Sequence, residues 1–317
     1  MAQPTSKQVH EDALLTNISI AYQQDPSVYI ADKVFPFVAS AKQSNKYRTY
    51  TKNDWFRDEM KILAPGAEAA VTGYGLSTDT FYCDVWALAH DVDEQVESNF
   101  DEPGDPYTDA TALLTQLAMI RRERQWHSDY FGTGVWGTDV TGTTDFDKWT
   151  VATSNPKANI RTGYKTVLQN TGMMPNTLVV GYNVHDALVQ HPLIRDQFKY
   201  TSSDSIDANM LARYFDIPRY MVSKAIYATN EEGATGAYSF VGGDHALLCY
   251  VNPTPSLRAP SAGYTIGWAG LTGLNGLATR MLRIPAPLRH ATRIEIQMAF
   301  DLKKVAADVG YFFASAV

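Results

Sequence analysis

The sequence is poor in cysteine and has no excess of positive charge. Its 317 residues include only Cys83 and Cys249, which are far apart and match no zinc-site spacing. Two buried free thiols are the expected state, and a disulfide is the alternative. Lysine and arginine total 27 against 34 aspartates and glutamates, a formal charge of −7, which argues against a dedicated nucleic-acid-binding protein.

A secretory signal and a long apolar run are also lacking. Glu11 and Asp12 stand where a signal peptide needs an apolar core, so we expect no secretion by that route. The longest uncharged run lies between Arg258 and Arg280 and holds five glycines among Thr, Ser and Asn residues. A lipid-spanning helix would be more apolar, so we predict a flexible Gly-rich connection in a soluble chain without a membrane partner.

No catalytic or cofactor motif occurs in its proper context. GTGVWG at 132–137 has the G-x-G-x-x-G spacing of a dinucleotide loop, but a predicted helix precedes it and a polar, turn-rich stretch follows it. The motif requires a strand before it and a helix after it. We interpret Gly132 as the left-handed residue that ends the helix, and Trp136 as a packing residue. We expect no catalytic residue, no cofactor and no metal.

Two charged clusters leave alternative interpretations. An acidic stretch could hold a cation or be a solvated face, and the solvated face is favoured. An arginine cluster either contacts nucleic-acid phosphates or pairs with Glu123 and neighbouring acids, and pairing is favoured. The acidic stretch consists of His90, Asp91, Asp93, Glu94 and Glu97, and the arginine cluster of Arg121, Arg122 and Arg124.

The clearest helix is predicted after Pro106, from near Thr108 to Phe131. At 1.5 Å per residue it would span about 35 Å and form a structural spine. Apolar residues fall on one stripe of this helix, which predicts the face that is buried. That stripe consists of Leu113, Leu117, Ile120 and Phe131.

Strand patterns occur on both sides of this helix. The β-prone segments that begin at Lys46 and at Ser77 flank the turn-prone APGAE and TGYG, which predicts a long hairpin with a charged tip. From about 154 to 260, strands alternate with helices, which predicts a compact α/β unit. In TRIEIQMAFDLK, at 292–303, apolar and polar residues alternate, which predicts a long strand with one buried face.

Two segments are predicted to need a partner. YIADKVFPFV at 29–38 is interrupted by Pro36, which favours an extended arm laid on another surface over a helix or a central strand. KNDWFRDEMK at 52–61 mixes charges of both signs around two aromatic residues, a composition typical of protein–protein contacts. The candidate subunit-interface residues are Val34, Phe35, Phe37, Trp55, Phe56, Arg57, Asp58 and Glu59.

Six stretches, in this order along the chain, resemble one known family. They are YIADKVFPFV, LSTDTFYCDVWAL, YFGTGVWGTDVTGT, NTLVVGYNVHDALVQHP, PSAGYTIGW and MAFDLKKVAADVGYFFASAV. Over essentially its whole length the chain resembles the major capsid proteins of tailed bacteriophages, which adopt the Hong Kong 97-like fold.

The resemblance implies an α+β fold with a peripheral and an axial domain. The implied parts are an N-terminal arm at 1–45, an extended β-hairpin loop at 46–83, a peripheral domain with a spine helix and long strands at 84–150, an axial α/β domain at 151–275, and a return to the peripheral domain at 276–317. Here the arm starts near Met1, whereas many relatives first carry a scaffolding segment, so scaffolding is expected to be a separate protein or to be unnecessary.

The implied partners are copies of the same chain. Hexamers and pentamers would assemble in the bacterial host cytoplasm and close into the icosahedral shell of the virion around double-stranded DNA, contacting that DNA weakly and non-specifically. Portal, scaffolding or decoration proteins are further expected partners. Two alternatives remain: an encapsulin-like compartment shell that holds cargo enzymes and, less favoured, a nucleotide-dependent enzyme built on the 154–260 unit.

Overall fold

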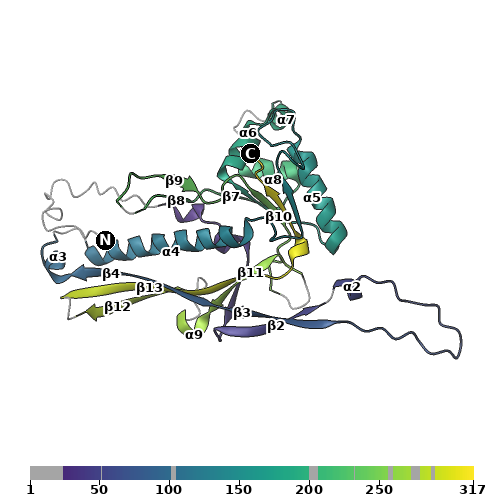
Figure 1. The fold of residues 1–317 in the computed structure, drawn as a ribbon, viewed down its shortest axis with the longest axis horizontal. Coiled ribbons are helices and arrows are strands. Elements are labelled where there is room, and N and C mark those ends of the chain that lie inside the picture. Colours follow the sequence, from purple (N-terminus) through teal and green to yellow (C-terminus); the bar gives the residue numbers. More distant parts are fainter. Residues whose placement is uncertain are drawn as a thin grey trace.

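The computed structural model describes residues 24–317 except 51, 101–104, 200–205, 232, 256–259, 273–278 and 287–289. These residues form a mixed α+β fold with two five-stranded sheets and two two-stranded ribbons. One long helix lies along the first sheet, shorter helices cover one face of the second, and one ribbon carries a loop far from the body (Figure 1). The predicted α+β class is confirmed.

The first sheet is organised around one long strand, β13 (Ala291–Lys304). Its order is β1-β11-β13-β12, and β4 pairs with β13 along the other edge. β13 is antiparallel to β4, β11 and β12, whereas β1 is parallel to β11. The remaining strands are β1 (Phe37–Ser40), β4 (Asp84–Asp93), β11 (Gly263–Trp268) and β12 (Thr279–Ala286).

The alternation predicted for β13 is confirmed. Its apolar side chains pack under the spine helix α4 (Pro106–Tyr130), together with Leu114 and Ala118 of that helix. Burying each large apolar side chain contributes about 1.5–3 kcal/mol, so this contact fixes the helix along the sheet. The buried residues of this face of β13 are Ile294, Ile296, Met298 and Phe300.

The second sheet is buried on both faces. Its order is β5-β14-β10-β6-β7, and every residue of β6, β10 and β14 is buried. One face packs against the helices of the α/β unit and the other against the last turns of α4. The strands are β5 (Thr138–Thr141), β6 (Thr177–Gly181), β7 (Arg219–Ser223), β10 (Ala246–Cys249) and β14 (Gly310–Ala314). The helices are α5 (Pro156–Thr171), α6 (Tyr182–Gln190), α7 (Pro192–Phe198) and α8 (Ala208–Phe215).

The predicted hairpin is present as an isolated ribbon. β2 (Ser44–Tyr50) and β3 (Leu76–Tyr82) pair in antiparallel register, and the segment between them includes the single-turn α2 (Lys52–Trp55). The returning segment is not one strand, because it breaks at Cys83 between β3 and β4. The other elements are α1 (Ala31–Val34), α3 (Glu94–Ser98), β8 (Ile226–Ala228), β9 (Tyr238–Phe240), α9 (Ala269–Thr272) and the 3₁₀ turns Pro26–Val28 and Ala307–Val309.

The glycine-rich run after Arg258 is not a flexible connection where the structure describes it. Residues 263–268 form β11, which lies between β1 and β13. Glycine is needed there for close packing rather than for flexibility: a Cβ on Gly263 would lie 2.9 Å from the Lys303 carbonyl oxygen and 3.3 Å from the Phe35 ring. Gly273 and Gly276 lie outside the described residues.

The predicted buried stripe of the spine helix is wrong for two of its four residues, while Phe131 packs against the core. Leu113 and Leu117 are 49% and 40% exposed, whereas Ala110, Leu114 and Ala118 face the sheet. Apolar periodicity misplaced the face because the buried side of α4 combines small alanines with charged residues. Its polar members are Arg122, Glu123 and His127. None of the helices in the described residues is long and apolar enough to cross a membrane.

GTGVWG connects a helix to a strand, the reverse of a dinucleotide loop. The predicted role of Gly132 is wrong, because α4 ends at Tyr130 with Phe131 as its C-cap, and the left-handed glycine is Gly134, with φ of 79°. Trp136 is a packing residue as predicted: it is buried, and its indole Nε1 donates a hydrogen bond to the Tyr130 carbonyl oxygen at 2.8 Å.

We expect Gly310→Ala to destabilise the chain by about 1–3 kcal/mol or more. A Cβ on Gly310 would lie 2.1 Å from Trp136 Cε3, and the indole hydrogen bond prevents that ring from moving aside. Chemical denaturation of the purified chain measures the change. Gly132→Ala is the matched control, because its added Cβ meets its nearest atom at 3.7 Å; equal stability of the two variants would contradict this packing.

Candidate interface surfaces

Two of the predicted interface residues are covered by their own chain. Val34 and Phe35 are fully buried, so the prediction that they need a neighbouring subunit is wrong. The centroid of the Phe35 ring lies 5.6 Å from that of Trp126 and 4.8 Å from that of Tyr130, and both of these residues are in the last turns of α4. Their segment also contains the helical turn α1, which we had not predicted. Phe37 begins β1, an edge strand, and is half-buried.

The same segment is attached to the spine helix by polar contacts. Glu123 Oε2 accepts hydrogen bonds from the backbone N–H groups of Ile30 at 3.0 Å and Ala31 at 2.8 Å. Asp32 Oδ1 lies 2.8 Å from Arg122 Nη1, and the Arg122 guanidinium is 5.0 Å from the Phe300 ring centroid. For Arg122, pairing with a neighbouring acid is therefore confirmed.

The other two arginines stack on aromatic rings. Arg121 lies 4.0 Å from the Trp86 ring centroid and Arg124 lies 4.4 Å from that of Tyr227. These distances are typical of cation–π contacts. Within the described chain, neither arginine forms the ion pair that we predicted.

The hairpin loop exposes both aromatic and apolar side chains. Trp55 is 59% and Phe56 65% exposed, and Trp55 packs only against Tyr50 and Tyr74 among the described aromatic rings. Arg57 forms ion pairs with Asp54 and Glu59 at 4.0 and 3.7 Å, both inside the loop. Asp58 is exposed. Five of the predicted interface residues thus lie together on a surface that the described chain leaves open.

Sequence analysis missed the most exposed part of this loop. Met60, Ile62 and Val71 are between 95% and 103% exposed, so their apolar side chains contact almost nothing in the described chain. The run MKIL at 60–63 could have revealed these exposed residues in the sequence. Apolar residues beside charged residues in a turn-rich loop are too far from a hydrophobic core to be buried in it. Exposed apolar groups concentrated on one projecting loop indicate an interaction site.

The base of the loop is tied to the body at two points. Lys52 Nζ forms an ion pair with Asp308 at 2.9 Å, and Phe56 lies beside Gly172, the left-handed residue that ends α5. The loop beyond these contacts extends away from both sheets (Figure 1).

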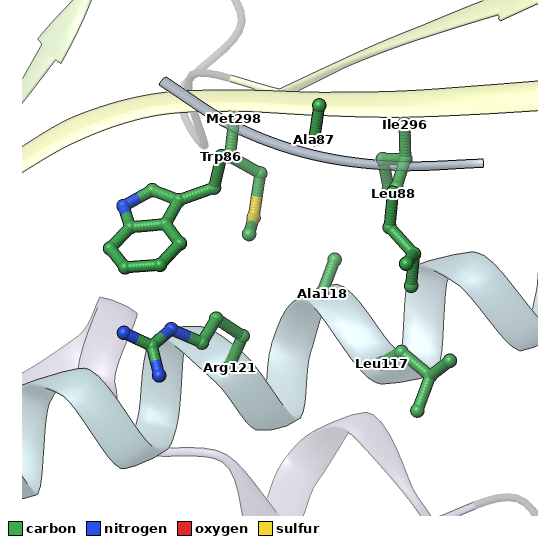
Figure 2. A pocket seen from close by; sticks show the side chains of 8 residues that line it. All are labelled: Trp86, Ala87, Leu88, Leu117, Ala118, Arg121, Ile296 and Met298. Carbon is green, nitrogen blue, oxygen red and sulfur yellow. The ribbon is translucent and has the colours of Figure 1, made fainter. Parts of the chain in front are cut away.

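A shallow apolar cavity of about 240 Å³ lies between α4 and the first sheet. Figure 2 shows Trp86, Leu88 and Met298 from the sheet opposite Leu117 and Arg121 from α4, with the Arg121 guanidinium under the Trp86 ring. Its lining contains no acid, histidine or cysteine, and Arg121 is its one charged residue.

The residues of the acidic stretch make separate contacts with different partners. Asp91 binds Arg293 through two hydrogen bonds of 2.6 and 2.9 Å, and Asp93 caps α3 by accepting the Gln95 N–H. The Glu97 carboxylate accepts a hydrogen bond from the Tyr107 hydroxyl. Among the described residues no cluster of three His, Cys, Asp or Glu side chains could hold a metal ion.

Both cysteines are expected to be unreactive in the folded chain. Cys83 and Cys249 are free and fully buried, as predicted, and burial raises the pKa of each thiol to about 12. Because the thiolate is the reactive form, we expect no reaction with a thiol reagent at pH 8 and two reacting thiols per chain after denaturation. Rapid labelling of either thiol before denaturation would contradict the burial.

Comparison with known proteins identifies the fold. The chain is 25% identical over 272 residues to the major capsid protein of Burkholderia phage BcepMu, covering 80% of this chain and 82% of that protein. No known family profile matches it. A phage-related protein from Bordetella bronchiseptica superimposes with a TM-score of 0.69 at 22% identity, over 92% of this chain and 93% of that one.

Shell proteins of known structure share this architecture. The capsid of cyanophage P-SCSP1u matches with a TM-score of 0.62 at 9% identity, over 99% of this chain and 95% of that one. The SrpI encapsulin of Synechococcus elongatus matches with a TM-score of 0.57 at 11% identity, over 99% and 96%. The chain therefore has the Hong Kong 97-like capsid fold and is similar in sequence to the major capsid protein of one phage.

Proposed function

We propose that this chain is the major capsid protein of a tailed phage and that many copies close into an icosahedral head shell around double-stranded DNA. The observation that carries the proposal is the projecting loop, whose apolar side chains have almost no cover in the described chain. A loop of this kind gains stability only when another molecule covers it. Relatedness to a phage major capsid protein indicates a second copy as that molecule.

In this proposal each part of the fold has a place in the shell. The loop at 46–83 overlaps a neighbouring subunit, the first sheet with α4 forms the peripheral domain, and the second sheet with α5–α8 forms the axial domain at the centre of each capsomer. The predicted boundaries at 150 and 275 shift accordingly, because β11 belongs to the first sheet, whereas β5 and β14 belong to the second. The arm at 1–45 contributes further contacts. Many weak interfaces then become cooperative because the symmetry of hexamers and pentamers closes them.

The proposed role is structural, without catalysis, cofactor or metal. The acidic balance of the chain suits a container, because tight phosphate contacts would hinder DNA packing and release. Assembly would take place in the host cytoplasm, with portal, scaffolding or decoration proteins as additional partners.

Electron microscopy of the overexpressed full-length chain tests this function. We expect closed shells or free hexamers and pentamers. A chain that stays monomeric over a range of concentrations and salt, alone or beside the products of its neighbouring genes, would overturn the proposal.

An encapsulin-like compartment is the second candidate, supported by the structural match to the SrpI encapsulin. The two candidates differ in what the shell encloses. Terminase and portal genes beside this gene, with DNA inside particles isolated from the native source, support the phage capsid. A cargo enzyme inside those particles supports the compartment.

A further inference from the structure

One buried carboxyl group has no part in the shell contacts proposed above. Glu123 is fully buried in α4, and its side chain joins three elements. Oε2 accepts the N–H groups of Ile30 and Ala31 at the start of α1, while Oε1 lies 3.4 Å from the Ser223 hydroxyl at the end of β7. This carboxyl group therefore links the N-terminal segment to the spine helix and to the second sheet.

No cation among the described residues neutralises this carboxyl group. Arg122, the preceding residue of α4, is directed to Asp32 and the Phe300 ring. His127 Nδ1 lies 3.8 Å from Glu123 Oε1 but is hydrogen-bonded to the Glu123 backbone carbonyl at 2.9 Å. Burial lowers the pKa of His127 to about 4, and nearby His245 adds to that shift, so this ring is neutral at neutral pH.

Ionisation of Glu123 is costly because burial removes the water that would solvate a carboxylate. Burial raises the pKa of Glu123 to about 7. The N–H groups of Ala31 and Ile30 and the Ser223 hydroxyl oppose this rise, and the charge of Asp32 adds to it. The remaining titratable group facing it is Tyr29, whose own pKa is raised, first by burial and then by Glu123. The carboxyl group thus exchanges its proton near neutrality.

We propose that Glu123 is a proton-controlled latch, which holds residues 29–35 against the spine helix when protonated and favours their release when ionised. In the released state water reaches the carboxylate, so its ionisation no longer carries the cost of burial. Release also uncovers Val34 and Phe35 and the Trp126 ring beneath them. The latch would make these apolar groups available in a pH-dependent way.

The direction of the pH effect follows from which state binds the proton more tightly. The closed state has the higher pKa, about 7 against the ordinary 4.5 of a solvated carboxyl group. Closure is therefore fully stabilised below about pH 4.5, weakens as the pH rises to about 7, and changes little above that. Between pH 6 and pH 8 the equilibrium constant for opening is expected to increase about tenfold.

Hydrogen exchange of the full-length chain, followed by mass spectrometry at pH 6 and pH 8, tests the latch. After division by the intrinsic rate at each pH, amides of residues 29–35 are expected to exchange about tenfold faster at pH 8. Strand β6 (Thr177–Gly181) is fully buried, contains no acid and serves as the internal reference whose corrected rate stays constant. Equal corrected rates for residues 29–35 at the two pH values would overturn the latch.

Glu123→Gln assigns the effect to this side chain. The amide is neutral, nearly isosteric and still able to accept an N–H, so the variant should exchange slowly at both pH values. Glu68→Gln, on the exposed loop, is the matched control and should retain the wild-type response. A pH response that persists in Glu123→Gln would also overturn the latch, and if that variant does not fold, the wild-type comparison alone decides.

The outcome is separable from the proposed shell function. The same preparation is compared at two pH values, with its assembly state checked at each by light scattering. Absence of shells would refute the proposed function without altering the exchange result. Exchange rates of residues 29–35 that do not change with pH would refute the latch, even in a chain that still forms shells.

Discussion

Replacing residues 51–75 by an Asn-Gly turn is expected to abolish closed shells while leaving the unfolding free energy of the chain nearly unchanged. Tyr50 and Leu76 are directly opposite in the ribbon, so a two-residue turn can join them without changing the register of β2 and β3. Electron microscopy reports shell formation and chemical denaturation reports stability.

The two parts of this expectation have separate physical reasons. The loop contributes little to the folded chain, since its main contacts with the body are an exposed ion pair from Lys52, of about 0–1 kcal/mol, and the Phe56 ring beside Gly172. Its exposed apolar groups would be lost from every copy of the interface in the shell. Because a closed shell repeats each contact in every subunit, loss of the loop weakens assembly far more than it weakens the folding of one chain.

Point substitutions separate loop length from loop chemistry. The triple variant Met60→Gln, Ile62→Gln and Val71→Gln keeps the length of the loop but removes its most exposed apolar groups, so shells should again be absent. Lys61→Gln, in the same exposed loop, is the matched control and should assemble normally. Shells of normal appearance from the triple variant and from the turn variant would refute the role of the loop.

Arg122→Leu is expected to lower the free energy of unfolding by about 2 kcal/mol, because it removes a charge-assisted hydrogen bond between the buried Arg122 guanidinium and the exposed Asp32 carboxylate. The Arg122 side chain is 5% exposed, it lies 2.8 Å from Asp32, and it stacks near the Phe300 ring. Chemical denaturation at neutral pH measures the loss.

Arg124→Leu provides the matched control on the same helix. Arg124 is exposed and stacks on Tyr227, so we expect a loss below about 1 kcal/mol. Adding Asp32→Asn to Arg122→Leu should cost less than the sum of the two single changes, since both act on one contact. Equal losses for the two arginine variants would show that the Arg122–Asp32 pair does not stabilise the fold.

Much of the fold was predictable wherever one local pattern determines one element. Alternation in residues 292–303 identified β13. The two β-prone segments around a turn-rich stretch identified the β2–β3 ribbon. In each case the information lies within a few residues of the element itself.

The errors occur where distant segments decide the outcome. Leu113 and Leu117 had the apolar character of a core, but the sheet packs against Ala110, Leu114 and Ala118 instead. Val34 and Phe35 seemed to need a partner, but Trp126 and Tyr130, about ninety residues away, cover Phe35. Gly263 seemed to belong to a flexible run, but it allows close packing against Lys303 and Phe35.

The sequence by itself determined the resemblance to capsid proteins, the order of elements and the location of the projecting loop, because these depend on local pattern and on which segments cannot bury themselves. Only the tertiary structure decided which face of the spine helix is buried, which apolar residues remain for a partner, and that Glu123 lies beneath the N-terminal segment. Burial and pKa depend on the atoms that surround a side chain, and most of those atoms come from residues far away along the chain.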